Sequence, residues 1–419
     1  MSFLKSFFQI FKKKKESDIT RGTISQETLN SDHLETTNST DTSLEQPVQE
    51  LNTSDQEKQT KTQINVKSSE DSTQTTQKIE PLDDFQKLIQ WLHKAGIGNL
   101  KTQEEIEQYT KLEIDNSSLT EIPSSIDYFV NLKELSITKS AITSLPDSIG
   151  NLTDLEVLII SNNQLKSLPD SFESLTNLKY LVISHTQLTS ANFIGKLTKL
   201  ETLALDNNKI TELPSQIGNL ASLKKLNVFY NRLTSLPNSL GNLKRLKELN
   251  ISDNALEAIP GAVFTGLARL EVLEALNNDL TELPSEIGVL VNLQVLNLSY
   301  NELKLPEEIG QLVNLQELII TESNLSSLPE SIGNLKELKK LYLHHNNLTY
   351  LPDSICNLIN LEELTLTHNK LQSLPDSICK LTNLESLILN NNQLTEIPPC
   401  LKTLKKLKTL NLTNNQLDD

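Results

Sequence analysis

A repeat of 23 residues dominates this chain of 419 residues and constrains its fold more than any other feature. Three copies read LEVLIISNNQLKSLPDSFESLTN from residue 155, LKKLNVFYNRLTSLPNSLGNLKR from residue 223 and LEELTLTHNKLQSLPDSICKLTN from residue 361. They share the pattern LxxLxLxxNxLxxLPxxIxxLxx, with 13 full copies from residue 109 and a partial fourteenth copy. A fixed period of this length is typical of solenoids, in which each unit stacks on its neighbours.

Each conserved letter of the pattern has a structural role, and the positions of a coil are numbered here from its first leucine. Leucines at positions 4 and 6, with a variable residue between them, predict a short strand with one buried face, and stacked copies form a parallel sheet. An asparagine at position 9 can satisfy buried backbone groups at the turn, because its amide both donates and accepts. Ten of the fourteen coils have it, from Asn163 to Asn415, and Ser117, Ser140, Thr186 and Ser323 replace it elsewhere.

The second half of the repeat predicts the return path of the chain. Its Leu-Pro step fixes the backbone and prevents a regular helix, so the following residues form a turn or a short helical arc. Because this return side is bulkier than the strand side, the stack must curve. We therefore predict an α/β fold, a curved solenoid with a parallel β-sheet on its concave face and an N-terminal helical cap. Residues 178–199, 246–269 and 293–314 break the period and are expected to alter the curvature locally.

The pattern resembles that of leucine-rich repeat proteins over about three quarters of the chain. Its LPxxIGxL return segment is similar to that of the intracellular Ras-group repeat proteins of plants, the related Ras-pathway scaffold of animals and bacterial cytoplasmic relatives. The resemblance implies a non-catalytic scaffold that binds other proteins. An alternative is a secreted bacterial effector that acts on host proteins, because effectors of this class also place a helical pair before the array.

We expect four parts along the chain. Residues 1–15 form an amphipathic basic segment, residues 16–80 a polar linker, residues 81–108 a helical cap and residues 109–419 the repeat array. The linker is rich in Ser, Thr, Asn and Gln and has no aromatic residue, so it cannot bury enough apolar surface to offset chain entropy, and we expect disorder.

The cap is predicted from two helix signals. Phe85, Leu88 and Leu92 recur at helical spacing, and Gly96 stands where a C-terminal cap belongs. The segment from Thr102 to Glu105 reads as a capping box for a second helix. Such a helical pair would cover the exposed core of the first coil.

The N-terminal segment combines an apolar helical face with a run of lysines. This order differs from a secretory signal, in which the positive charge precedes the apolar stretch. It fits a helix that lies on an anionic membrane surface, and a partner-binding helix is the alternative. The predicted membrane-surface residues are Phe3, Leu4, Phe7, Phe8, Phe11, Lys12, Lys13, Lys14 and Lys15.

The variable strand positions 3, 5, 7 and 8 are expected to face solvent on the concave side, where solenoids usually make contacts. Aromatic and imidazole side chains collect there, although aromatic residues are only 4% of the chain. Because large amphipathic side chains dominate interface energetics, we predict that a partner protein binds there. The predicted partner-binding residues are Val157, Ile159, Tyr180, Val182, His185, Phe229, Tyr230, Tyr300, Ile319, Tyr342, His344, His345 and His368. From Lys133 to Glu271, position 2 nearly alternates between lysine and glutamate, which predicts a stabilising charge ladder instead.

The histidines allow one alternative from another functional class. His345 and His368 share position 8 of adjacent coils, with His344 beside them, and could in principle form a metal-binding or enzymatic site. However, no cysteine or paired carboxylate completes a tetrahedral set, and an open strand row offers no shaped pocket. We therefore predict no metal, no cofactor and no catalytic residue.

The charge of the chain limits the classes of partner that we expect, and its cysteine content indicates the compartment. The formal net charge of −16 is a poor match for nucleic acid, so we expect no nucleic-acid partner. Cys356, Cys379 and Cys400 form no evident framework. A disulfide between the first two is conceivable because both occupy position 19 of adjacent coils, but free thiols in a reducing compartment are expected. We expect a cytoplasmic protein, peripheral at the inner face of a membrane, and the sequence leaves its partner and oligomeric state undefined.

Overall fold

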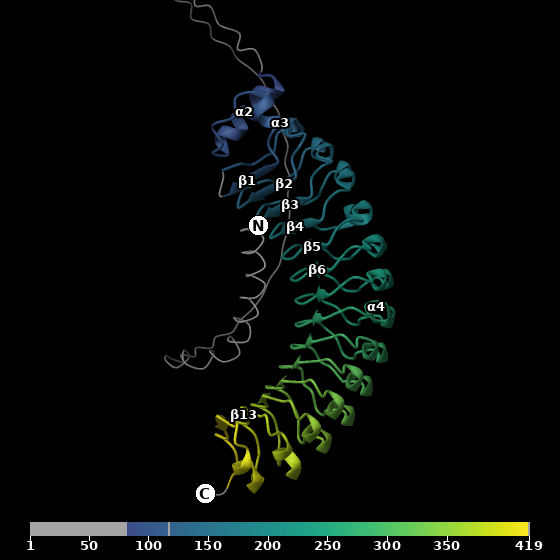
Figure 1. The fold of residues 1–419 in the computed structure, drawn as a ribbon, viewed down its shortest axis with the longest axis vertical. Helices are drawn as coiled ribbons and strands as arrows, with labels where there is room; N and C mark the ends of the chain where they lie inside the picture. Colours follow the sequence, from purple (N-terminus) through teal and green to yellow (C-terminus); the bar gives the residue numbers. More distant parts are fainter. Residues whose placement is uncertain (1–81, 116–117, 418–419) are drawn as a thin grey trace, which may run out of the picture. The chain divides into compact units, whose positions relative to one another are not determined.

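The computed structural model describes residues 82–115 and 118–417. In this part of the chain, fourteen strands form one parallel sheet, and each strand pairs with those of the preceding and following coils. The register advances by one coil per step, as where Leu158 pairs with Leu181. Strands line the inner side of the curved array and the return segments line its outer side (Figure 1). The predicted α/β solenoid, with its parallel sheet on the concave face, is confirmed.

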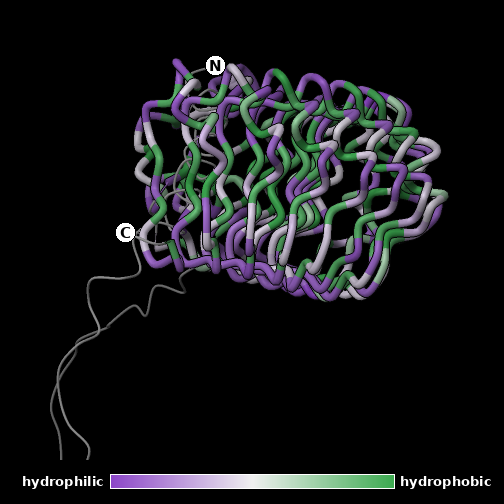
Figure 2. Tube along the Cα trace, turned by 90° about the horizontal axis from the view of Figure 1, so that it is seen from below, coloured by the Kyte–Doolittle hydropathy of each residue, from purple (hydrophilic) through white to green (hydrophobic). Residues whose placement is uncertain are grey.

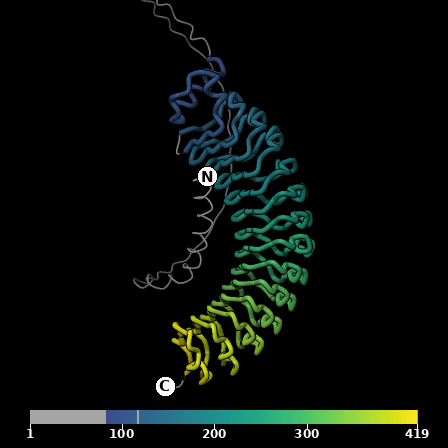
Figure 3. Tube along the Cα trace, in the orientation of Figure 1, coloured from purple at the N-terminus to yellow at the C-terminus, as the bar shows by residue number. Residues whose placement is uncertain are grey.

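Each coil contributes one short strand, so successive coils lie side by side along the array (Figure 3). The strands are β1 (Lys111–Asp115), β2 (Glu134–Thr138), β3 (Val157–Ser161), β4 (Tyr180–Ser184), β5 (Thr202–Ala204), β6 (Lys225–Asn227), β7 (Glu248–Asn250), β8 (Val272–Glu274), β9 (Val295–Asn297), β10 (Glu317–Ile319), β11 (Lys340–Tyr342), β12 (Glu363–Thr365), β13 (Ser386–Ile388) and β14 (Thr409–Asn411).

Most return segments are single turns of 3-10 helix. They are η1 (Ser124–Tyr128), η2 (Asp147–Asn151), η3 (Asp170–Ser174), η4 (Asn192–Lys196), η5 (Ser215–Asn219), η6 (Asn238–Asn242), η7 (Ser285–Val289), η8 (Glu307–Gln311), η9 (Glu330–Asn334), η10 (Asp353–Asn357), η11 (Asp376–Lys380) and η12 (Pro399–Thr403). In the longer coil 246–269, the extra residue turns this segment into an α-helix, α4 (Gly261–Gly266). The extra residue therefore changes the convex side in this coil, whereas coils 178–199 and 293–314 keep the 3-10 turns η4 and η8. The local change of curvature in the three coils stays a prediction.

The leucines of the pattern build one continuous core between the sheet and the return segments. Hydrophobic stretches recur at matching places in successive coils (Figure 2). Phe129, Phe172 and Phe264 are the largest side chains that the core buries completely. Each coil packs only against its neighbours, so the core extends as a strip along the array.

Two helices precede the array, which confirms the predicted helical cap. Helix α2 (Asp84–Lys94) begins at a capping box, in which the Asp83 side chain accepts a 2.7 Å hydrogen bond from the Gln86 amide. After the helix, Gly96 has a φ of 85°, the left-handed conformation that glycine adopts without strain. Helix α3 (Gln103–Glu107) begins at the predicted capping box of Thr102 and Glu105.

A buried tryptophan joins the cap to the first coil. Trp91 on α2 is 5% exposed, and its indole N–H donates a 2.8 Å hydrogen bond to the Glu121 carbonyl. Leu88 and Leu92 on the same face are fully buried. Helix α2 thus covers core that would otherwise be open to water.

The cysteine pairing differs from the prediction. Cys379 bonds to Cys400, with their Cα atoms 5.9 Å apart, and Cys356 stays free and buried. The reason is an offset between neighbouring return segments. Position 19 of one coil faces position 17 of the next, as where a Cβ added to Gly218 would lie 2.6 Å from the Ser239 carbonyl oxygen. The expectation of free thiols is therefore wrong for Cys379 and Cys400.

The predicted basic segment at residues 1–15 and the predicted linker at residues 16–80 lie outside the described residues. Among the helices that are described, none is long and apolar enough to cross a membrane.

Candidate binding surface

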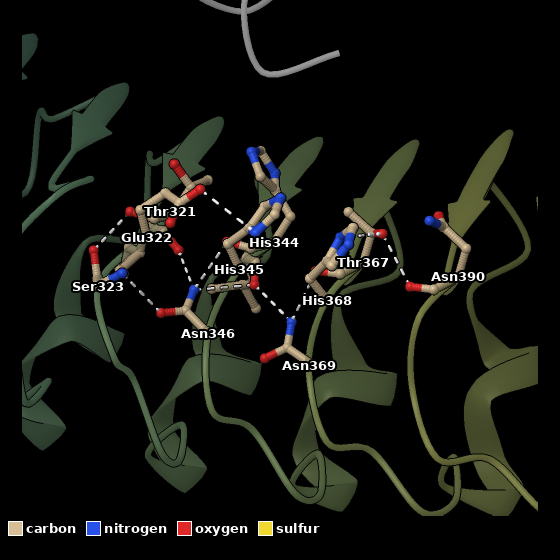
Figure 4. Close-up of polar contacts among 12 residues, drawn as sticks. Thr321, Glu322, Ser323, His344, His345, Asn346, Thr367, His368, Asn369 and Asn390 are labelled. Atoms are coloured by element: carbon tan, nitrogen blue, oxygen red, sulfur yellow. Dashed lines mark hydrogen bonds and ion pairs between the residues drawn. The ribbon is translucent and has the colours of Figure 1, made fainter. Parts of the chain in front are cut away.

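Asparagine side chains fix the chain where each strand ends. The Asn346 amide donates to the carbonyls of Ile320 at 2.7 Å and Leu343 at 3.0 Å. Its side-chain oxygen accepts from the backbone N–H groups of Ser323 at 3.2 Å and Leu325 at 3.0 Å (Figure 4). The predicted use of one amide as both donor and acceptor is confirmed. These bonds tie adjacent coils together just below the concave face.

The residue before this asparagine, at position 8, has a left-handed backbone. This conformation recurs from the second coil to the fourteenth, with φ between 49° and 57°. The residues are Lys139, Asn162, His185, Asn207, Tyr230, Asp253, Asn277, Tyr300, Glu322, His345, His368, Asn391 and Asn414. The turn therefore presents one side chain per coil along the C-terminal ends of the strands.

Position 2 forms the predicted charge ladder at the other end of the strands. Lys179 pairs with Glu156 at 2.7 Å, and Lys224 pairs with Glu201 at 2.8 Å. The bond from Lys179 holds the pKa of the Glu156 carboxyl below its usual value. These side chains are 35% to 44% exposed, so each pair stabilises the fold only slightly. We assign the ladder to the alignment of coils.

The predicted patch in the N-terminal half is only partly accessible. Tyr230 is 58% exposed and His185 is exposed, whereas Val157, Tyr180 and Phe229 are half-buried. The prediction fails for two members, because Ile159 and Val182 expose only 4% and 3% of their surface. They pair in register on β3 and β4, outside the main core. They can support a contact surface but offer it little area.

The second patch gathers around the histidines that follow β11 and β12. Tyr300 is 52% exposed, and Ile319, Tyr342, His344, His345 and His368 are half-buried. The Tyr342 hydroxyl donates a 2.5 Å hydrogen bond to Glu363, and burial raises its pKa. The Tyr342 hydroxyl is therefore already engaged within the surface.

Three imidazoles lie in contact on this face. His345 stacks on His368 with ring centroids 4.2 Å apart, and His344 meets the edge of His345 at 5.7 Å (Figure 4). His345 also lies 3.5 Å from a Glu322 carboxylate oxygen. Burial, followed by the charges of the other two histidines, lowers the pKa of His344 to about 4. His344 is therefore neutral near pH 7, and its Nδ1 atom has no partner among the described residues.

Family comparisons agree with this architecture. A family model described as a leucine-rich repeat region matches residues 66–206, 186–304 and 285–369. The chain belongs to the leucine-rich repeat proteins. A second model, described as a leucine rich repeat, matches residues 359–417 of this repeat protein. A search of curated proteins found no match.

Solved structures of other leucine-rich repeat proteins resemble the chain over most of its length. A Leptospira interrogans repeat protein is 33% identical, with a TM-score of 0.57, over 75% of this chain and 93% of that one. The Listeria monocytogenes internalin InlF is 25% identical, with a TM-score of 0.67, over 80% and 95%. The ectodomain of the Arabidopsis thaliana receptor kinase GASSHO1, in complex with CASPARIAN STRIP INTEGRITY FACTOR 2, is 31% identical. That match covers 73% of this chain and 42% of the receptor, with a TM-score of 0.58.

The chemistry of the face fits contact better than catalysis. Leucine-rich repeat proteins are generally non-catalytic binding scaffolds. Within residues 82–115 and 118–417, no group of three or more His, Cys, Asp or Glu side chains could hold a metal ion. The stacked imidazoles of His345 and His368 lie face to face, so their ring nitrogens do not converge on one point.

The sequence reasoning missed one residue that the structure adds to this surface. Glu322 occupies position 8, beside His345, and burial followed by the charge of Glu322 raises the pKa of Tyr300. Its column in the repeat alignment was a usable signal, because position 8 was already assigned to the concave face.

Proposed function

We propose that this leucine-rich repeat protein is a non-catalytic scaffold that binds a partner protein on its concave face. The observation that carries the proposal is the row of large side chains at the strand ends, among them Tyr230, Tyr300 and His345. Two of these are tyrosines with more than half of their surface exposed. Exposed tyrosine rings are typical anchors of protein interfaces, because they bury a large area at a small entropic cost.

Site-specific photo-crosslinking tests this proposal. A photoreactive amino acid in place of Tyr230 or Tyr300 should capture the partner protein in cells. The same group in place of Tyr350, which is 54% exposed but lies outside the strands, is the matched control. Capture from Tyr350 alone would contradict binding on the concave face.

We further propose that residues 2–15 attach the protein to a membrane surface. The support is the sequence itself, in which an apolar helical face precedes Lys12 to Lys15. Each lysine near an anionic surface contributes about 1 kcal/mol, so four of them and a small apolar face give reversible attachment. Deleting residues 2–15 should move the protein from the membrane fraction to the soluble fraction, and unchanged fractionation would refute the attachment.

The proposed location is the cytoplasm, at the inner face of a membrane. The Cys379–Cys400 bond argues against it, because disulfides persist mainly in oxidising compartments. Acid denaturation of whole cells, which preserves the thiol and disulfide states and exposes the buried Cys356, followed by alkylation and mass analysis, separates the two locations. Modification of all three cysteines fits a cytoplasmic protein, and modification of Cys356 alone excludes it.

A secreted bacterial effector is the second candidate. The similarity to the Leptospira interrogans repeat protein over 93% of that chain favours a bacterial relative. An effector should accumulate outside the producing cell without lysis. Detection in the cell fraction only, under conditions that induce secretion, would remove this candidate.

A further inference from the structure

The left-handed turn at position 8 has a different energetic cost for each residue type. Asparagine and aspartate enter this region readily because their short side chains can bond to the local backbone, whereas other side chains crowd the following carbonyl. Six coils use these favourable residues: Asn162, Asn207, Asp253, Asn277, Asn391 and Asn414. The same turn therefore forms well without a larger side chain at position 8.

Against this background, Tyr230, Tyr300 and Glu322 are unfavourable choices for the fold. Their φ angles are 53°, 55° and 53°. The two tyrosine rings gain little from burial in return, because they are 58% and 52% exposed. Strained residues that persist without a packing gain are commonly found where a protein meets a ligand. These three side chains are thus better explained by a contact than by stability.

The charge around these residues indicates the kind of partner. In coils 7 to 10, which run from residue 246 to 337, the concave positions 3, 5, 7 and 8 and the turn position 10 beside them hold no lysine or arginine. The carboxylates at these positions are Glu248, Asp253, Glu274, Asp279, Glu302, Glu317 and Glu322. In the preceding coil, which carries Tyr230, Lys225 and the exposed Arg232 offset two of these charges, and Lys225 pairs with Glu248 at 2.7 Å. The face between Tyr230 and Glu322 is therefore strongly acidic, with tyrosine rings set into it.

We propose that the row from Tyr230 to Glu322 binds an extended basic segment of the partner protein. Arginine or lysine side chains of that segment lie over the faces of Tyr230 and Tyr300, and the neighbouring carboxylates supply the opposite charge. A cation is attracted to the face of an aromatic ring and to a carboxylate at once, so the two contacts reinforce each other. This inference rests on the proposed function and names the partner chemistry for the same surface.

The length of the segment follows from the spacing of the coils. Coils 6 and 10 are four strand spacings apart, which is about 19 Å at roughly 4.8 Å per spacing. An extended chain covers about 3.3 Å per residue, so about six residues cross the row. The segment runs across the strands, along the array.

The stability of variants tests the strain argument. Tyr230→Asn and Tyr300→Asn introduce the residue that the same turn carries in other coils, so each should raise the melting temperature of the full chain by about 1–3 °C. Tyr350→Asn is the matched control, because Tyr350 is equally exposed but has no positive φ, and it should give no rise. A lower melting temperature for Tyr230→Asn and Tyr300→Asn would overturn the argument that the fold does not need these rings.

A random twelve-residue peptide library displayed on phage tests the partner chemistry. Selection on the full chain should enrich peptides with two or more arginines or lysines. A synthetic copy of an enriched peptide should bind about tenfold more weakly to Tyr300→Asn and to Glu322→Gln than to the unchanged protein. Its affinity for the control Tyr350→Asn should equal its affinity for the unchanged protein. Its affinity should also fall as salt concentration rises.

The outcomes separate this inference from the proposed function. The selection could instead enrich acidic or purely apolar peptides that bind more weakly to Tyr300→Asn. That result would overturn the basic segment, but the proposal that a partner binds on the concave face would stand. Binding of basic peptides that none of the concave substitutions weakens would overturn both. An absence of any enriched peptide would also overturn the inference, because it requires a short segment to suffice.

Discussion

At the scale of single residues, the position 9 asparagine has the clearest structural role. Asn346 is 6% exposed and joins its own coil to the preceding one through both sides of its amide. Replacing it removes donors and acceptors from backbone groups that water cannot reach. Such groups are costly when unpaired, and this cost exceeds the value of the bonds themselves.

We therefore expect Asn346→Ala to lower the free energy of unfolding by about 2–4 kcal/mol, measured by urea denaturation. Asn347→Ala is the matched control, because its side chain makes a single 3.3 Å bond to Asn324. It should change the free energy of unfolding by less than about 1 kcal/mol. Equal effects of the two substitutions would show that the amide ladder does not hold the coils together.

The histidine cluster predicts a second residue-scale effect. The pKa of His344 is about 4 in the folded chain, against 6.5 as its ordinary value. Between these pH values the unfolded chain binds more protons, so the free energy of unfolding must fall as pH drops from 6.5 to 4 and level off below. For this side chain the loss is at most about 3 kcal/mol. Burial and the charge of His345 also lower the pKa of His368, which adds in the same direction.

The variant His344→Thr isolates this contribution, because Thr321 and Thr367 occupy the same position in the adjacent coils. Thermal unfolding followed between pH 7 and pH 4 should show a smaller loss of stability for this variant than for the unchanged protein. His185→Asn, at an exposed position, is the control and should retain the full loss. An unchanged pH dependence in His344→Thr would assign the effect to other groups.

The role of position 9 could be predicted from the sequence, while the strain at position 8 could not. An amide is needed at a buried turn for reasons of donor and acceptor chemistry, which the residue type itself reveals. A left-handed φ depends on the path of the backbone through the turn. The residue types at Tyr230 and Glu322 do not indicate this conformation. The recurrence of asparagine at position 8, as in Asn162 and Asn277, was the available signal.

At the scale of elements, helix α2 closes the N-terminal end of the core. Its position was predictable because the apolar spacing and Gly96 agree. The pairing of Cys379 with Cys400 was not predictable, because a shared repeat position does not reveal the offset between return segments. The repeat register predicts directly which strand residues pair between adjacent coils. It does not predict directly which residues of adjacent return segments face each other on the convex side.

The cap predicts an unfolding experiment with a built-in probe, since Trp91 is the only tryptophan of the chain. Leu88→Ala should destabilise the cap by about 2–4 kcal/mol, because Leu88 is fully buried. Each coil contacts only its neighbours, so Trp91 fluorescence should then change at a lower urea concentration than the circular dichroism of the whole array. Gln90→Ala, on the exposed face, should leave the two transitions as they are in the unchanged protein. Coincident transitions in Leu88→Ala would mean that the array unfolds as one unit.

At the scale of the whole molecule, the residues that stabilise the array differ from those that are displayed for binding. The core and the asparagine ladder hold the coils in register, and the concave face displays the side chains that vary between coils. Curvature and the parallel sheet follow from the repeat alone. The accessibility of single residues on that face does not, as the burial of Ile159 and Val182 demonstrates.

The most direct test of the account is affinity capture of the partner with a variant of the concave face. The account predicts that the unchanged protein recovers a partner and that Phe229→Ala/Tyr230→Ala loses it. The control Tyr350→Ala/Ile359→Ala alters two residues that are 54% and 52% exposed outside the strands, and it should recover the partner in full. Equal recovery by the two double variants, both folded by circular dichroism, would contradict binding on the concave face.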